Sequence, residues 1–176
     1  KNHFDAYIDT NAHYIYDAQK NEWSKGKTAP TARNSAASVV IDGLIYVVGG
    51  RHNVMQEDGT QLQQNLSNLE VYNPETNEWQ TRAPLPESLG GNAAASVGGK
   101  LYVFGGEQWA PEKKVFPSSW AYDPASDKWQ KVADMPTARH GLAAAAVDDV
   151  IYTIGGCTKV GGGATVGATE ALVFSK

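Results

Sequence analysis

The chain has 176 residues, a formal net charge of −4 and a single cysteine, Cys157. The mild acidity and the lack of a basic stripe disfavour nucleic acid and anionic membranes as partners. No apolar run reaches the ~18 residues of a membrane-spanning helix, and one cysteine excludes an intrachain disulfide.

One pattern of aromatic, proline and glycine residues occurs three times in the same register. Each copy has a Tyr, a Trp seven residues later, a Pro seven further on, and a Gly pair 26 residues after the Trp. The copies are Tyr16, Trp23, Pro30 and Gly49-Gly50; Tyr72, Trp79, Pro86 and Gly105-Gly106; Tyr122, Trp129, Pro136 and Gly155-Gly156. Three copies about 50 residues apart indicate a repeat array such as a propeller.

Short β-forming runs fill each copy, and the segment between Trp and the Gly pair has no helical apolar period. Two strands are predicted before residue 30. The following strands are predicted at 36–41, 44–49, 68–73 and 78–83; at 92–97, 100–105, 118–123 and 128–132; and at 142–147, 150–155 and 170–174. Tight hairpin turns are expected at Asp42-Gly43, Gly98-Gly99 and Asp148-Asp149. The prediction is an all-β fold of thirteen strands, with four-stranded antiparallel sheets as its unit.

The first strand of each unit is rich in alanine, as in Ala93-Ala94-Ala95 and Ala143-Ala144-Ala145-Ala146. Alanine is a poor strand former, so its repeated use indicates crowding near a central axis. The large aromatics belong further out, where neighbouring sheets diverge. Six of them are predicted to be core residues: Tyr16, Tyr72, Tyr122, Trp23, Trp79 and Trp129.

All length variation lies in one connection of each unit. The second Gly precedes the next aromatic by 22 residues at Tyr72, 16 at Tyr122 and 18 at Phe174. Surface loops tolerate such variation and scaffold strands do not. Residues 51–66, 107–117 and 157–168 are therefore predicted to be loops on one face.

Three stretches resemble the kelch repeat: Leu44 to Gly50, Tyr72-Asn73-Pro74 with Trp79, and Pro136-Thr137-Ala138-Arg139. The resemblance covers nearly the whole chain and implies a β-propeller whose first strands are innermost. The sequence Pro-Thr-Ala-Arg-His and the Gly-rich final loop resemble bacterial kelch proteins more than animal ones. A soluble protein of the cytoplasm, the periplasm or the exterior fits, so the compartment stays open.

On this resemblance the chain is one propeller domain made of partial and complete blades. Residues 1–32 supply the third and fourth strands of an incomplete blade, 33–86 and 87–136 are kelch blades, and 137–176 is a blade without its fourth strand. Exposed sheet edges invite pairing, so a partner is expected. It is either a second copy, forming a head-to-tail homodimer, or a missing N-terminal half-propeller. In such a dimer the strand led by Trp23 of one copy completes the last blade of the other. Two strands then compete for the third position of that blade, and the N-terminal one is expected to move aside.

Arg33 and Arg139 occupy the same repeat position, three residues after the Pro. Alternation of strands places them at the mouth of the pore, on the face that carries the loops. Trp109 lies outside the repeat register. The predicted ligand-binding set is Arg33, Asn34, Arg51, His52, Glu107, Trp109, Arg139 and His140. Arg forks suit an acidic peptide; the alternative is that the arginines bond backbone carbonyls of the neighbouring blade. For Trp109 the alternative is packing on the adjacent blade.

No His or Cys spacing supports a metal site, no nucleophile elbow is present, and Gly161 to Gly167 lacks the Gly-Lys-Ser/Thr ending of a phosphate loop. No cofactor is predicted. The expected function is a non-catalytic module that binds a protein segment or a carbohydrate. The alternative is part of a sugar-active kelch enzyme similar to sialic-acid mutarotases or to galactose oxidase; the catalytic residues of these enzymes do not map onto the chain.

Overall fold

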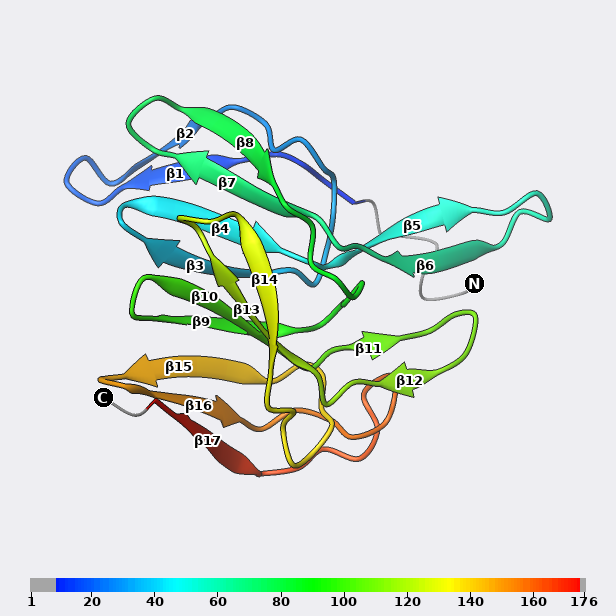
Figure 1. Ribbon diagram of the computed structural model, residues 1–176. Coiled ribbons are helices and arrows are strands. Elements are labelled where there is room, and N and C mark those ends of the chain that lie inside the picture. The colour runs from blue at the N-terminus through cyan, green and yellow to red at the C-terminus, as the bar shows by residue number, and fades with distance from the viewer. Residues whose placement is uncertain (1–8, 175–176) are drawn as a thin grey trace.

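The computed structural model describes residues 9–174, which form six antiparallel sheets. Four of them are arranged as successive sectors of an arc, and the other two are hairpins in the connections (Figure 1). The four sheets of the arc are named blades A to D. Blade A is β1 (Tyr14–Asp17) and β2 (Glu22–Lys25); blade B is β3 (Ala37–Ile41), β4 (Leu44–Val48), β7 (Leu69–Asn73) and β8 (Glu78–Arg82). Blade C is β9 (Ala93–Val97), β10 (Lys100–Phe104), β13 (Ser119–Asp123) and β14 (Lys128–Val132); blade D is β15 (Ala143–Val147), β16 (Val150–Ile154) and β17 (Thr169–Val173). The thirteen predicted strands are confirmed; the first eight residues of the predicted N-terminal unit lie outside the described residues.

The first strands are innermost, as their alanines predicted. β3 contacts β9, and β9 contacts β15. Backbone hydrogen bonds join the starts of these strands: Gly91 N donates to Ser35 O over 2.9 Å, and Gly141 N donates to Gly91 O over 2.8 Å. Small side chains permit this close approach of three sheets around one axis.

The first two Gly pairs admit the backbone of the following blade. Gly50 N donates to Leu89 O over 2.8 Å, and Gly106 N donates to Arg139 O over 2.9 Å. A Cβ at Gly49 would lie 2.6 Å from Leu89 O, closer than a side chain allows. Glycine is therefore required here both for space and for a positive φ of 66°.

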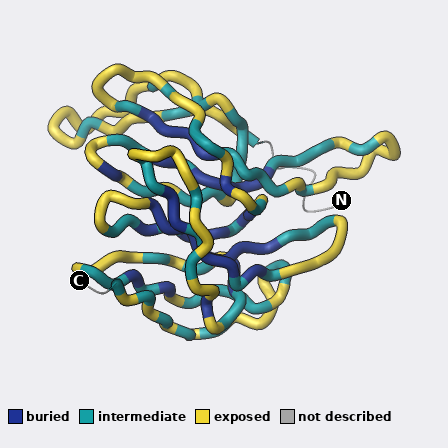
Figure 2. Tube along the Cα trace, in the orientation of Figure 1, coloured by how far each residue is buried: buried dark blue, intermediate teal, exposed yellow. Residues whose placement is uncertain are grey.

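The aromatic positions follow the prediction in blades B and C and depart from it in blade A. Tyr72 and Tyr122 are buried, with 2% and 0% of their surface exposed, and Trp79 and Trp129 are half-buried. The prediction is wrong for blade A. Tyr16 is 46% and Trp23 69% exposed, because no further sheet among the described residues covers that side (Figure 2).

Two predictions about the variable connections are corrected. The first two contain ordered hairpins rather than unpaired loops: β5 (Arg51–Met55) pairs with β6 (Gln61–Asn65), and β11 (Glu107–Gln108) with β12 (Lys114–Val115). In blade D, Leu172 faces Ile151 as Tyr122 faces Leu101 in blade C. Leu172, not Phe174, is therefore the repeat counterpart of Tyr122, and the last two connections are equal at 16 residues.

Replacement of Trp79 by alanine tests the register. The Trp79 indole packs on Tyr72 with ring centroids 5.1 Å apart, and its Nε1 donates to Lys27 O over 2.8 Å. Trp79→Ala is expected to lower the free energy of unfolding by roughly 3 kcal/mol, measured by chemical denaturation. Trp23→Ala removes an exposed indole and should cost less than about 1 kcal/mol. Equal losses in the two variants would contradict the register.

Candidate binding face

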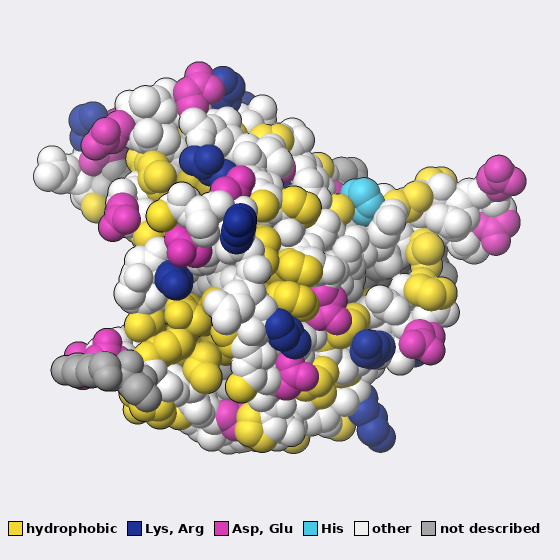
Figure 3. All heavy atoms as spheres, viewed as in Figure 1, with side chains coloured by type: hydrophobic (Ala, Val, Ile, Leu, Met, Phe, Trp, Pro, Cys, Tyr) yellow, Lys and Arg dark blue, Asp and Glu magenta, His cyan; other side chains and the backbone are white. Residues whose placement is uncertain are grey.

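The variable connections lie on one side of the sheets, opposite the hairpin turns of the inner strands, and two of them project as arms (Figure 1). The longer arm, β5–β6, exposes apolar side chains on its strands: Met55 is 62% and Leu62 38% exposed. Its tip carries the exposed acidic residues Glu57 and Asp58. Figure 3 shows this arm standing off from the body of the molecule. These protruding hairpins provide surface that is not needed for packing between the blades.

A buried carboxylate, Glu107, holds the bases of three connections together. Glu107 Oε1 accepts from Arg51 Nη1 over 2.9 Å, and Oε2 accepts from the Gly161 N–H over 2.7 Å. Its backbone oxygen accepts from Asn65 Nδ2 over 2.7 Å. Both Arg51 and Glu107 are nine-tenths buried. One residue of blade C thus fixes the β5–β6 arm on one side and the last connection on the other.

His140 joins the same cluster from blade D. Its Nε2 lies 2.9 Å from Gly161 O and 3.0 Å from Lys159 O, so an N–H at this nitrogen is placed to donate a hydrogen bond to these carbonyls. The same nitrogen is 3.4 Å from Glu107 Oε2. Four of the described residues therefore form one contact network across three blades: Arg51, Glu107, His140 and Gly161.

Arg33 and Arg139 are interior residues with matching partners. Arg139 is fully buried; it donates to Glu170 Oε2 and Thr153 Oγ1, both over 2.8 Å, and to Gly155 O over 2.7 Å. Arg33 forms a buried ion pair with Glu70. Burial lowers the pKa of the Arg33 guanidinium, and the Glu70 carboxylate opposes this shift.

These contacts agree with carbonyl bonding, the alternative expected for the arginines. Arg33 Nη1 donates to Gly49 O over 3.0 Å, as Arg139 Nη1 does to Gly155 O. The carbonyls belong to the arginine's own blade, not to the neighbouring one. Because each guanidinium already faces a carboxylate, the geometry does not support the Arg-fork basis for an acidic peptide.

The remaining predicted site residues, Asn34, Trp109 and His52, lie beside the Arg51–Glu107–His140 network. Asn34 donates from Nδ2 to Asp9 Oδ1 over 2.6 Å. The half-buried Trp109 packs on Gly161, where a Cβ would lie 3.2 Å from the ring, and Lys113 Nζ is 5.4 Å from the ring centroid. This is the packing on the adjacent blade that was the alternative for Trp109. His52 lies on the arm, with Nε2 3.3 Å from Gln64 Oε1. Asn34 and Arg51 exchange backbone hydrogen bonds of 2.9 Å, so Asn34 adjoins the Arg51–Glu107–His140 network, as Trp109 does through Gly161. Arg33 and Arg139 instead pair with carboxylates inside their own blades.

Sequence reasoning missed the carboxylates that pair with the arginines. Glu70 and Glu170 occupy the same place in the third strand, opposite Val47 and Thr153. Blade C has Trp120 at that place, and it has Leu89 where the other blades have arginine. The joint exchange of Arg and Glu for Leu and Trp between repeats is the signal that could have identified the pairs.

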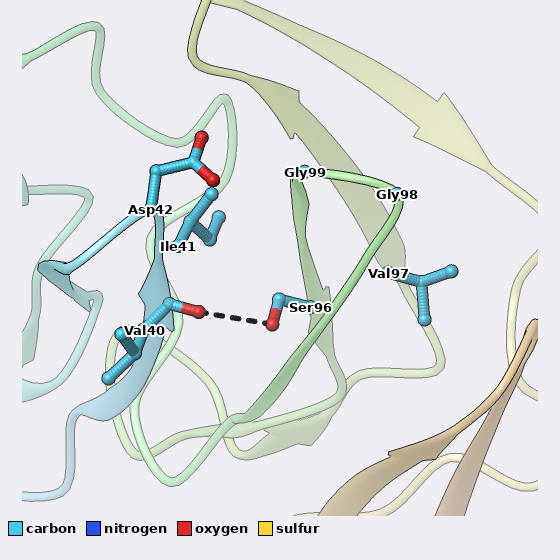
Figure 4. Close-up of a pocket in the computed structure, with 7 residues that line it drawn as sticks. All are labelled: Val40, Ile41, Asp42, Ser96, Val97, Gly98 and Gly99. Carbon is cyan, nitrogen blue, oxygen red and sulfur yellow. Dashed lines mark hydrogen bonds between the residues drawn. The ribbon is translucent and has the colours of Figure 1, made fainter.

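The opposite face carries a shallow pocket of about 260 Å³ between the hairpin turns of blades B and C. Ser96 Oγ donates to Val40 O over 3.3 Å at its floor, while the side chains of Val40 and Val97 point away from each other (Figure 4). Backbone and glycine form much of its wall, so it offers few side chains for recognition. Within residues 9–174 no group of three His, Cys, Asp or Glu side chains is arranged to hold a metal ion, and no helix is long and apolar enough to cross a membrane.

Comparisons with known proteins agree with the repeat pattern. Residues 4–156 match the family model of the KLHDC2/KLHL20/DRC7 Kelch-repeats domain. Human Kelch-like protein 33 is 34% identical over 91 residues, which are 52% of this chain and 15% of that protein. The F-box/kelch-repeat protein At1g67480 of Arabidopsis thaliana is 41% identical over 93 residues, 53% of this chain and 23% of that protein. The chain thus spans less than a quarter of these relatives.

The solved structure of YjhT superposes with a TM-score of 0.71 and 24% sequence identity. The match covers 85% of this chain and 53% of that one. Identity at this level shows a shared fold, which is the β-propeller.

Proposed function

The chain belongs to the kelch-repeat family, and we propose that it is a non-catalytic binding module that recognises a protein segment through the face carrying the β5–β6 and β11–β12 arms. The observation that carries this proposal is the fixed base of these arms. Glu107, Arg51 and His140 hold the bases of the connections in place, so the outer surface of the arms is left to contact a partner. Rigid scaffolds that present loops commonly bind in this way.

The chemistry of the arms favours a peptide of mixed character. Met55 and Leu62 offer apolar surface, the tip of the β5–β6 arm is acidic at Glu57 and Asp58, and the β11–β12 arm exposes Lys113 and Lys114. The Trp109 indole, which could stack on a sugar ring, is packed on Gly161 instead. A protein segment is therefore favoured over a carbohydrate.

An enzymatic role draws less support from the same face. Glu70, Glu107 and Glu170 each pair with an arginine. A carboxylate held in such a pair is already engaged by a side chain of the protein and is poorly placed to contact a substrate. Binding is therefore favoured over participation in a sugar-active enzyme.

Selection from a phage-displayed peptide library tests the proposal. Peptides selected on the wild-type chain should lose about tenfold or more in affinity for a Met55→Ser/Leu62→Ser variant, measured by calorimetry. The matched control is Val40→Ser/Val147→Ser, which changes two similarly exposed residues on the hairpin-turn side. If only the control variant loses affinity, the peptide binds on the hairpin-turn side and the face proposed here is wrong. A chain that selects no peptide but binds glycans on an array would contradict recognition of a protein segment.

Completion of the arc by a further β-segment is a second part of the proposal. Blade A exposes Tyr16 and Trp23, and blade D exposes Val173 and Ile154. A head-to-tail second copy would have to break an existing pairing, because β1 is paired with β2 and β17 with β16. This cost favours a separate segment, such as one from another half-propeller, over the homodimer expected from the sequence.

A further inference from the structure

The β5–β6 arm has two edges, and they differ in what lies beside them. In an antiparallel pair, alternate residues point their N–H and C=O groups away from the partner strand. Arg51 points these groups to the outer edge of β5, because it exchanges backbone hydrogen bonds of 2.9 Å with Asn34 there. The same alternation assigns outward-pointing groups to Asn53 on β5 and, by register, to Gln63 and Gln61 on β6. Each edge of the arm therefore carries backbone groups that are able to pair with a further strand.

The outer edge of β5 is already covered. At its base the edge pairs with Asn34, and the next outward N–H, that of Asn53, donates to Asp9 Oδ2 over 2.6 Å. The other oxygen of this carboxylate, Oδ1, accepts from Asn34 Nδ2 over 2.6 Å. Asp9 thus occupies the position that the carbonyl of an added strand would take. A strand that added to this edge would have to displace it.

The outer edge of β6 is covered only at its base. The Asn65 side chain lies there and donates from Nδ2 to Glu107 O over 2.7 Å and to Ser88 O over 3.2 Å. Towards the tip, the backbone groups of Gln61 and Gln63 have no hydrogen-bond partner among the described residues. Within residues 9–174, β5 is the only strand that pairs with β6, which forms the edge of its arm nearer to β11–β12 (Figure 1). The N–H donors and C=O acceptors of these glutamines are therefore left for a partner.

Nothing in the sequence of β6 shields this edge. Exposed edge strands are usually protected by a lysine, a proline or a β-bulge. β6 reads Gln-Leu-Gln-Gln-Asn, without a charge, a proline or a glycine, and it pairs with β5 at every position without a bulge. The base of the arm is held in place, because Arg51 is paired with Glu107. An ordered, unshielded edge is a template for the addition of a strand.

We propose that the outer edge of β6 receives an extended segment of a partner protein, which adds to the β5–β6 arm as its third strand. This mode of binding rests on the proposed function and specifies how the arm holds the protein segment. Main-chain hydrogen bonds to Gln61 and Gln63 supply the affinity, and the side chains that flank the added strand supply the specificity.

The surroundings of β6 define the chemistry of the segment. Leu62 is 38% exposed, and its side chain lies on the same face as that of Val54, its register partner. An apolar residue of the segment opposite Leu62 therefore gains a contact there. An antiparallel segment then runs towards the tip, where Glu57 and Asp58 are exposed. At ~3.4 Å per residue, a Lys or Arg about three positions after the apolar residue reaches these carboxylates.

A partner protein fits this edge better than a second copy of the chain. β6 contains no basic residue that could meet the acidic tip of another arm. Two copies, each with a net charge of −4, also repel each other. A segment with a basic residue complements both the tip and the net charge.

Two variants of one residue separate backbone pairing from side-chain contact. Gln63→Pro removes the outward N–H and places the pyrrolidine ring at the edge, while the bonds between β5 and β6 use other groups. Gln63→Thr keeps the N–H, and both variants lose the bond of 3.2 Å from Arg51 Nη1 to Gln63 Oε1. The probe is a fluorescein-labelled copy of the tightest-binding peptide from the library selection. Its affinity for Gln63→Pro should be at least about tenfold lower than for Gln63→Thr, measured by fluorescence anisotropy. Melting curves establish that both variants are folded.

Methylation of the amides of the peptide itself gives a second readout. Only alternate amides of an added strand face β6, and the others face away from it. A single N-methyl group moved along the peptide should therefore weaken binding at alternate positions and leave the positions between them unaffected. Recognition of side chains alone has no such period.

Three results would overturn strand addition. The first is equal affinity of the peptide for Gln63→Pro and Gln63→Thr. The second is a methylation profile without alternation. The third is a chain that is dimeric by light scattering and becomes monomeric with Gln63→Pro, which would assign the edge to a second copy. If the Gln63 variants bind equally while Met55→Ser/Leu62→Ser loses affinity, the arm face stands and only strand addition fails. A selection that returns no peptide contradicts the proposed function itself.

Discussion

Gly105→Ala is expected to destabilise the fold by roughly 3 kcal/mol or more, and it is the most damaging single methyl group that the structure predicts. A Cβ on Gly105 would overlap the carbonyl oxygen of Arg139, at the point where blade D meets blade C. The φ of 61° adds strain for any side chain. Neither partner can yield, because Gly106 N is bonded to the same carbonyl over 2.9 Å.

Gly155→Ala provides the matched control, measured in the same denaturation experiment. Gly155 occupies the same repeat position with a φ of 66°, but the nearest atom to its Cβ would be Val166 O at 3.8 Å. Only the backbone strain remains, so a loss of about 1 kcal/mol is expected. Similar losses at the two positions would show that strain, and not the approach of the next blade, explains the glycine.

Arg139→Leu is expected to cost roughly 3–5 kcal/mol, because it leaves the Glu170 carboxylate without its cation inside the blade. Arg139 is fully buried, and its guanidinium also satisfies the carbonyls of Gly155 and Ala168. Thermal and chemical unfolding of the purified variant measure the effect.

Adding Glu170→Trp to Arg139→Leu should restore about 2 kcal/mol. The double variant copies blade C, where Leu89 and Trp120 occupy these two positions and both are accommodated. The indole would also fill part of the cavity that Glu170 lines. If the double variant is less stable than Arg139→Leu alone, a Leu–Trp pair cannot replace the Arg–Glu pair in blade D.

The candidate face was only partly predictable from the sequence. The loop lengths located it, and the off-register Trp109 and the repeat-related arginines were assigned to it. Whether a polar side chain serves a ligand or the scaffold depends on what lies opposite. Arg51 and Glu107 are 56 residues apart and meet over 2.9 Å only because two connections converge. The spacing of residues in a single sequence does not reveal that these two connections meet.

The sequence by itself determined the strands, their turns and their order within each blade, because alternation, turn glycines and the Tyr–Trp spacing are local properties of the chain. It also determined that β3, β9 and β15 are innermost, because their small alanine side chains fit where neighbouring sheets come closest. Only the tertiary structure decided the rest. Trp23 is exposed whereas Trp79 is half-buried, although both obey the same pattern, because burial depends on whether a neighbouring blade is present. The structural role of the two arginines was likewise decided by the tertiary structure. Their carboxylate partners come from strands distant in sequence, and only the folded sheets bring them together.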